Sequence, residues 1–152
     1  FGYGYLTKIP GTVTSLVTAV FIYIAYEHLG YTDLKFSIIF FTLLFFYSFY
    51  AVKDAESEFK NKDPRQIVID EVLGQAMPLI LVLYLSQNNQ LSLQIEIYYV
   101  LSFIFFRFFD ILKPFPVSYF DKNFKNYFGI IMDDIMAGLY SMILIYLISL
   151  KF

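Results

Sequence analysis

The sequence Asp110-Ile111-Leu112-Lys113-Pro114-Phe115-Pro116 interrupts an apolar run with an aspartate, a lysine and two prolines. Further along, Gly129-Ile130-Ile131-Met132-Asp133-Asp134 places two adjacent aspartates at the start of another apolar run. Burying a carboxylate in an apolar helix costs on the order of several kcal/mol unless a cation compensates its charge. We therefore expect these acids to serve a site, and the rest of the chain to be a scaffold that brings further acids to it.

Composition indicates a membrane protein. The chain has 152 residues, of which 59% are hydrophobic and only 16% are charged, whereas soluble domains are about 25% charged. This length suits one domain, and we treat residues 1–152 as a single membrane-embedded unit. We expect a short piece to precede Phe1, and we find no cleavable signal peptide. The net charge of -2 gives no basic face for nucleic acid.

The rare residue types exclude several kinds of site. The sequence has no cysteine, which excludes disulfides, thiolate metal sites and cysteine nucleophiles. His28 is the only histidine, and we interpret it as a loop residue, so histidine-rich metal sites are excluded as well.

The pattern of apolar runs predicts an all-α, integral-membrane bundle of four or five helices. They are expected at about 13–26, 36–52, 66 to 84 or 85, 93–109 and 129–150. The first follows a loop, is capped by Thr12 or Thr14, and is short enough to be re-entrant or interfacial. Pro78 is expected to kink the third helix, and Pro114 and Pro116 to force an extended loop before the last.

Basic residues predict the orientation in the membrane. They fall between the second and third helices and between the fourth and fifth: Lys53, Lys60, Lys62, Arg65, Lys113, Lys122 and Lys125. Loops rich in lysine and arginine face the cytoplasm, and an odd number of crossings then places the N-terminus inside. This threading gathers almost every charged residue at the cytoplasmic helix ends, including Asp54, which belongs either to the site or to a solvated charge run.

A group of carboxylates without histidine or cysteine forms an all-oxygen site, which suits Mg²⁺. The divalent ion would relieve the mutual repulsion of the acids. Arg107 and Lys113, with Arg65, supply donors for a phosphate. A metal, phosphate-binding cations and a membrane location together suggest phosphoryl chemistry on a lipid headgroup.

Four blocks of the sequence resemble the phosphatidylglycerophosphatase A family across nearly the whole chain. They are IPGTVTSL (9–16), DP (63–64) with IVIDEVLGQ (67–75), FRFFDILKPFP (106–116) and GIIMDDIMAG (129–138). The resemblance implies a bacterial inner-membrane, Mg²⁺-dependent enzyme that removes the terminal phosphate of phosphatidylglycerophosphate to give phosphatidylglycerol. Thr14 stands where a glycine is expected before Ser15, and Asn126 and Tyr127 replace the glycines usual just upstream of Gly129.

These patterns assign a role to each candidate residue. The acids would supply the metal ligands and a general base: Asp70, Glu71, Asp110, Asp133 and Asp134. The metal set is expected to be Asp70, Glu71, Asp133 and Asp134. Arg107 and Lys113 would bind phosphate and stabilise transition-state charge. Thr12 and Ser15 would bind phosphate from a helix N-terminus, or only cap that helix.

Structural and functional alternatives remain for the same residues. Asp133 and Asp134, like Asp70 and Glu71, could be acids favoured at a helix N-terminus. Arg107 and Asp110 could form only an i, i+3 salt bridge, and Lys113 could be an interfacial anchor. The rival functions are a membrane phosphotransferase that joins two alcohols and an ion or proton transporter. Transporters place ionisable residues near mid-membrane, whereas these acids fall at helix ends.

Overall fold

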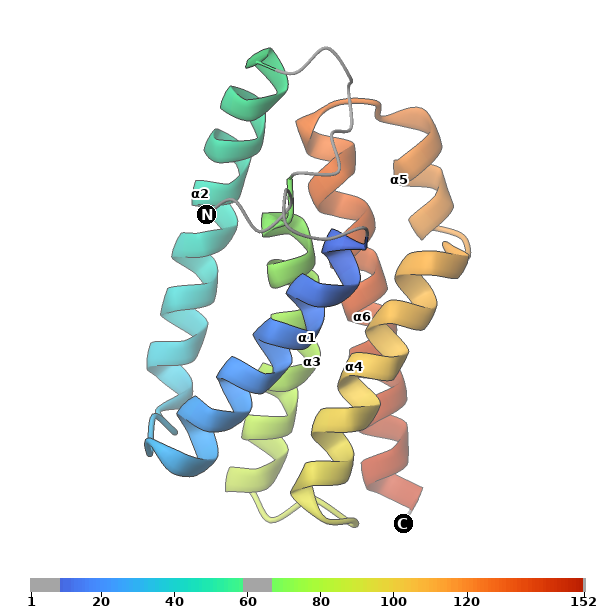
Figure 1. Cartoon of the computed structure of the whole chain (residues 1–152). Coiled ribbons are helices and arrows are strands. Elements are labelled where there is room, and N and C mark those ends of the chain that lie inside the picture. Colours follow the sequence, from blue (N-terminus) through green and yellow to red (C-terminus); the bar gives the residue numbers. More distant parts are fainter. Residues whose placement is uncertain (1–8, 59–66, 152) are drawn as a thin grey trace.

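The computed structural model describes residues 9–58 and 67–151, and these residues form helices joined by short connections (Figure 1). The elements are α1 (Pro10–Tyr23), the π-helical turn η2 (Ile24–His28), α2 (Leu34–Glu58), α3 (Ile69–Gln87), α4 (Ile95–Leu112), α5 (Val117–Asn123) and α6 (Tyr127–Lys151). No strand occurs in the described ranges, so the all-α prediction is confirmed for them.

The described residues contain six α-helices rather than the predicted four or five, and α5 is the addition. It lies in the segment that we expected to be an extended loop. Pro114 and Pro116 precede α5, where their missing N–H groups are not needed, and no proline or glycine interrupts Val117–Asn123. Val117 is fully buried and packs with Phe106 and Ala137. The loop prediction was therefore wrong, because the prolines mark the start of a helix.

The start of α1 also differs from the prediction. We expected a loop through Thr12 and a cap from Thr12 or Thr14, but α1 begins at Pro10 and its N-cap residue Ile9 makes no side-chain hydrogen bond. Proline suits the first helical position because its ring fixes φ near the helical value. Thr12 lies inside the first turn, so the capping prediction was wrong.

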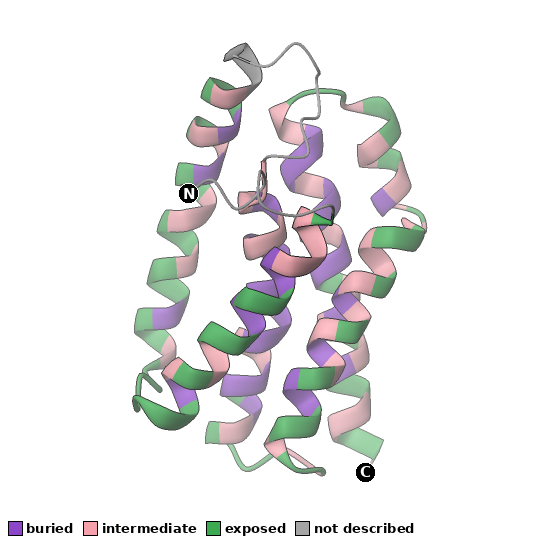
Figure 2. Ribbon diagram, in the orientation of Figure 1, coloured by how far each residue is buried: buried purple, intermediate pink, exposed green. Residues whose placement is uncertain are grey.

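Three of the described helices are long and apolar enough to cross a membrane: residues 34–55 of α2, and α3 and α6 over their full lengths. Much of α2 is exposed (Figure 2). Its exposed residues include large side chains such as Phe40, Leu43, Phe46 and Tyr50. An apolar face of this kind is typical of contact with lipid or with another apolar surface.

Helix α3 lies at the centre of the bundle and contacts α1, α2, α4 and α6. Its contact with α6 is very close: a Cβ atom added to Gly138 would lie 2.6 Å from the carbonyl oxygen of Gly74. Pro78, four residues after Gly74, has no N–H to donate to the Gly74 carbonyl, and α3 continues beyond Pro78. Small residues allow two helix backbones to touch in this way.

The antiparallel arrangement brings the starts of α1, α3 and α6 and the end of α4 to one end of the bundle (Figure 1). The candidate residues occupy these helix ends. Other charged residues lie at the opposite end, near the connections there: Glu27, Asp33, Lys35, Glu96 and Lys151. The charges of the described residues are thus divided between the two ends.

Candidate active site

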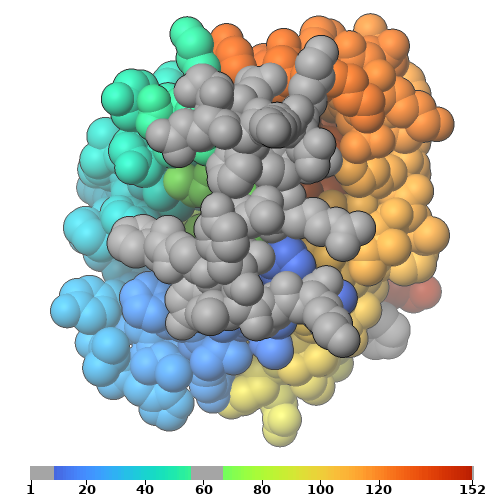
Figure 3. All heavy atoms as spheres, turned by 45° about the horizontal axis from the view of Figure 1, so that its top comes forward, coloured from blue at the N-terminus to red at the C-terminus, as the bar shows by residue number. Residues whose placement is uncertain are grey.

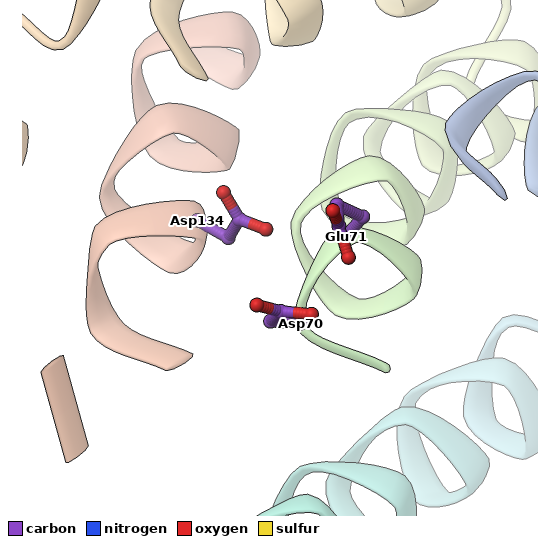
Figure 4. Close-up of side chains that lie close together, drawn as sticks. All are labelled: Asp70, Glu71 and Asp134. Carbon is purple, nitrogen blue, oxygen red and sulfur yellow. The ribbon is translucent and has the colours of Figure 1, made fainter. Parts of the chain in front are cut away.

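Three carboxylates meet between α3 and α6. Asp70 and Glu71 come from the first turn of α3, and Asp134 comes from about two turns into α6. One oxygen of each lies within 4.8 Å of the others. In Figure 4, the carboxylates of Asp70 and Asp134 lie in the gap between the two helices, with Glu71 beside them on α3. Asp70 is only 8% exposed and Asp134 only 4% exposed. We call these three residues the carboxylate trio.

The close contact of α3 and α6 explains why the acids meet. Asp70 precedes Gly74 by four residues, and Asp134 precedes Gly138 by four, so each acid lies on the same helix face as its glycine. A Cβ atom added to Gly74 would lie 2.7 Å from the backbone oxygen of Asp134. The glycines therefore allow the helices to approach until the two acid-bearing faces oppose each other.

The charge of the trio is only partly compensated within the described residues, by Arg107 near Glu71. Oδ1 of Asp70 and Oε2 of Glu71 are buried without a hydrogen-bond partner there, and no lysine or arginine in these ranges forms a salt bridge with the trio. Buried carboxylates without a partner are strongly unfavourable. Oxygen atoms grouped in this way are the ligands that Mg²⁺ prefers, so the residues present fit a bound Mg²⁺ ion.

Asp133 is held differently from its neighbour Asp134. The ammonium of Lys113 lies 2.6 Å from Oδ2 of Asp133 and 2.6 Å from Oδ1 of Asp121. Oδ1 of Asp133 accepts a hydrogen bond of 3.0 Å from the backbone N–H of Asp134. The structure thus brings Asp133 to the site, but outside the trio, with both of its oxygens engaged.

Lys113 ends α4 in the left-handed region, with φ of 46°. This conformation costs a lysine roughly 1–2 kcal/mol, which its two ion pairs can offset. Burial alone would lower the pKa of Lys113, but Asp133 and Asp121 outweigh burial and hold this pKa above its usual value. Burial would likewise raise the pKa of Asp121, but Lys113 outweighs it and lowers that pKa. Lys113 and Asp121 are therefore both charged at neutral pH.

Arg107 links α4 to α1. Its Nη1 lies 2.5 Å from Oδ2 of Asp110 and 3.5 Å from Oγ of Ser15, whose hydroxyl donates to the carbonyl of Gly11. The salt-bridge alternative for Arg107 and Asp110 is thus present in the structure. The Thr12 side chain makes no hydrogen bond to another described residue.

A cavity of about 120 Å³ opens among these helix ends. Its wall contains all five predicted acids and the unpredicted Asp121: Asp70, Glu71, Asp110, Asp121, Asp133 and Asp134. The wall also contains Lys113, which was predicted, and Lys125, which was not. Arg107, Thr12 and Ser15 lie outside this wall. Figure 3 shows this end of the molecule brought forward, with α2 in teal on one side and α5 in orange on the other.

The remaining candidates lie elsewhere. Asp54 is exposed on α2, away from the cavity wall, and His28 ends η2 at the opposite end of the bundle, where its ring meets that of Tyr23 edge to face. Thr14 is buried with its hydroxyl unpartnered in the described ranges. Lys60, Lys62 and Arg65 lie outside the described residues.

Known proteins resemble this chain along almost its full length. The family model of phosphatidylglycerophosphatase A matches residues 1–149. The phosphatidylglycerophosphatase A of Haemophilus influenzae is 34% identical over 98% of this chain and 84% of its own, and that of Escherichia coli is 28% identical over 98% and 79%. A Bacteroides thetaiotaomicron protein, named provisionally as a phosphatidylinositol-3-phosphatase, is 35% identical over 95% and 86%.

No solved structure matches the chain. The family match spans all four of the sequence blocks and the helices that carry the cavity. The relatives named for the family are phosphatases, which act as phosphoric monoester hydrolases. The chain therefore belongs to the phosphatidylglycerophosphatase A family.

Proposed function

We propose that this protein hydrolyses the terminal phosphate of phosphatidylglycerophosphate with the help of Mg²⁺, giving phosphatidylglycerol and inorganic phosphate. The observation that carries the proposal is the buried carboxylate trio, whose unpartnered oxygens adjoin a cavity at one end of an apolar helix bundle. Membership of the family supports the same substrate. A lipid phosphate would reach this cavity from the headgroup level of a bilayer.

Asp70, Glu71 and Asp134 would hold the ion. Asp133, also expected as a ligand, would join them through the lone pairs that its contacts with Lys113 and the Asp134 N–H leave unused. A bound Mg²⁺ ion would supply charge neutralisation and Lewis-acid polarisation of the phosphate oxygens.

The chain's own residues would manage the proton and the phosphate charge. Water attacks phosphorus, the bond from phosphorus to the glycerol oxygen breaks, and the leaving alkoxide takes up a proton. Two carboxylates of the cavity wall outside the trio, Asp110 and Asp133, are the candidates for the general base that takes the proton from water. Lys113 borders the same cavity and would stabilise the developing negative charge.

Arg107 has two candidate roles. In the structure it pairs with Asp110, so it can orient that carboxylate at the cavity wall. If Asp110 turned toward the ion, the planar guanidinium would be released to bind phosphate through two parallel N–H donors. Thr12 and Ser15 lie in α1 outside the cavity wall, and Ser15 is fully buried, so the binding of phosphate by these two residues stays a prediction.

We further propose a multi-pass location in the bacterial inner membrane, with the cavity facing the cytoplasm. Lys113, Lys122 and Lys125 near the cavity end support this orientation. Because the chain has no cysteine, Lys122→Cys and Asn88→Cys can each be labelled alone. We expect an impermeant reagent to label position 88 from the periplasm and position 122 only after permeabilisation. Labelling of both from the same side would contradict the orientation.

The function is tested by phosphate release from phosphatidylglycerophosphate in detergent micelles, with Mg²⁺ and with a chelator. Phosphatidylinositol 3-phosphate is the comparison substrate, because one relative carries that activity in its name. We expect rapid release from phosphatidylglycerophosphate only with Mg²⁺. Transfer of the headgroup phosphate to an alcohol without free phosphate would indicate a phosphotransferase. The absence of any turnover would favour a transporter.

A further inference from the structure

The cations around the cavity differ in whether they form ion pairs with carboxylates. Lys113 lies between two carboxylates at 2.6 Å each, and Arg107, which is outside the wall, is paired with the wall residue Asp110. Lys125 also lines the cavity, but it forms no ion pair or hydrogen bond with another described residue. Among the described residues, Lys125 acts on Asp121 only from beyond ion-pair distance, so it is the cavity lysine whose charge remains available to a ligand.

The exposure of its side chain indicates that Lys125 lies at the mouth of the cavity. Its side chain is exposed, whereas Asp70 and Asp134 are almost fully buried. An anion held near the trio would therefore lie deeper in the cavity, and an anion at Lys125 would lie nearer to the surface.

The turn that carries Lys125 is held firmly at both sides. The backbone N–H of Phe124 donates to the carbonyl of Phe120 at the end of α5. Oδ1 of Asn126 accepts from the backbone N–H of Gly129 at 3.2 Å, which caps the start of α6. A Cβ atom added to Gly129 would collide with the carbonyl of Phe124. These contacts hold the backbone of Lys125 next to the cavity.

The substrate of the proposed function, on which this step rests, carries two phosphates: a terminal monoester and a phosphodiester that joins the glycerol to the lipid. Six carboxylates in the wall repel a second anion everywhere except beside positive charge. We propose that Lys125 binds the phosphodiester, so that the cavity selects lipid phosphomonoesters that also carry a diester phosphate. The monoester would lie at the trio and the diester at the mouth, toward the lipid.

The test compares phosphatidylglycerophosphate with phosphatidic acid, a lipid that has a phosphomonoester but no diester. Lys125→Gln removes the charge, and Lys122→Gln removes an equal charge from exposed α5, outside the cavity wall. An exposed ion pair contributes up to about 1 kcal/mol, so KM for phosphatidylglycerophosphate should rise about fivefold in Lys125→Gln. Its kcat, and both constants for phosphatidic acid, should stay unchanged. Lys122→Gln should behave like the unmodified protein, and Lys125→Arg should restore the low KM.

The outcomes separate the two proposals. If the unmodified protein hydrolyses phosphatidylglycerophosphate but Lys125→Gln keeps its KM, the role of Lys125 is wrong and the function stands. An equal loss on both lipids would also overturn it, because Lys125 would then act only on the general charge of the cavity through Asp121. If the unmodified protein hydrolyses neither lipid, the function and the role of Lys125 both fall.

Discussion

The two ends of the bundle are built from the same helices in opposite ways. At the far end, α3, α4 and α6 pack buried side chains such as Leu79, Leu85, Tyr98 and Ile145 into a continuous apolar cluster. At the cavity end, the same helices present five carboxylates, α5 adds Asp121, and α3 and α6 approach through glycine. Burying like charges disfavours folding, whereas burying apolar side chains drives it. The contrast teaches that stability and chemistry are separated along the helices, so single substitutions should affect one without the other.

The largest effect is expected at the trio. Asp134→Asn removes a proposed metal ligand and should lower kcat at least about 10³-fold, since a bound metal contributes several kcal/mol to the transition state. Without Mg²⁺ its melting temperature should hold or rise, because a buried like charge has been removed. Glu96→Gln, an exposed acid at the far end, is the control and should change neither quantity. Near-normal turnover by Asp134→Asn would remove that residue from the site.

Arg107 tests whether the cavity end contains a phosphate ligand or only a salt bridge. If Arg107 binds phosphate, Arg107→Ala should lose about 3 kcal/mol of transition-state stabilisation, and Arg107→Lys should keep the fold but lose much of the rate. If it only neutralises Asp110, Arg107→Ala should mainly lower the melting temperature and Arg107→Lys should be nearly silent. Lipid-phosphatase rates and melting temperatures of both variants distinguish the two roles.

Stability and catalytic rate should both depend on the contact between Gly74 and Gly138. In Gly138→Ala the new Cβ would press on the Gly74 carbonyl, so α3 and α6 must separate. We expect a loss of roughly 1–3 kcal/mol in stability and on the order of tenfold or more in kcat, because the trio is displaced. Gly30→Ala is the matched control: φ of 70° strains the alanine, but no atom lies near its Cβ. It should lose stability and keep its rate. A fully active Gly138→Ala enzyme would contradict the role of the close contact.

The smallest effect on rate is expected in the far-end cluster. Ile145 is fully buried there, and Ile145→Ala should lower the free energy of unfolding by about 2–4 kcal/mol through the cavity that it leaves. Below its melting temperature, kcat should match that of the unmodified protein. Thermal denaturation in detergent, with rates taken well below the transition, measures both. A large loss of kcat in the folded variant would show that the two ends are not independent.

The sequence revealed the acids more readily than their partners. Asp70, Glu71, Asp110, Asp133 and Asp134 are conspicuous because they interrupt apolar helices, and all five border the cavity. The ion pairs of Lys113 could not be foreseen, because Asp121 reaches it only through α5. The prolines before α5 had suggested an extended loop.

Other differences have similarly local causes. Helix α1 begins earlier than expected, because Pro10 is suited to start a helix as well as to interrupt one. Lys125 was missed because an exposed lysine in a connection follows no helical period, and only the packing of α5 against α6 places it at the cavity. The places of Asp121 and Lys125 in the cavity wall thus depend on tertiary structure, and no residue pattern in this segment indicated them.

The central claim is that the trio binds Mg²⁺, and the most direct measurement is the melting temperature of the purified protein with and without Mg²⁺. A ligand that binds only the folded state raises the melting temperature. We expect Mg²⁺ to raise it in the unmodified protein and in Glu96→Gln, and to leave it unchanged in Asp70→Asn and Asp134→Asn. An equal rise in all four proteins would contradict the assignment of the trio as the metal site.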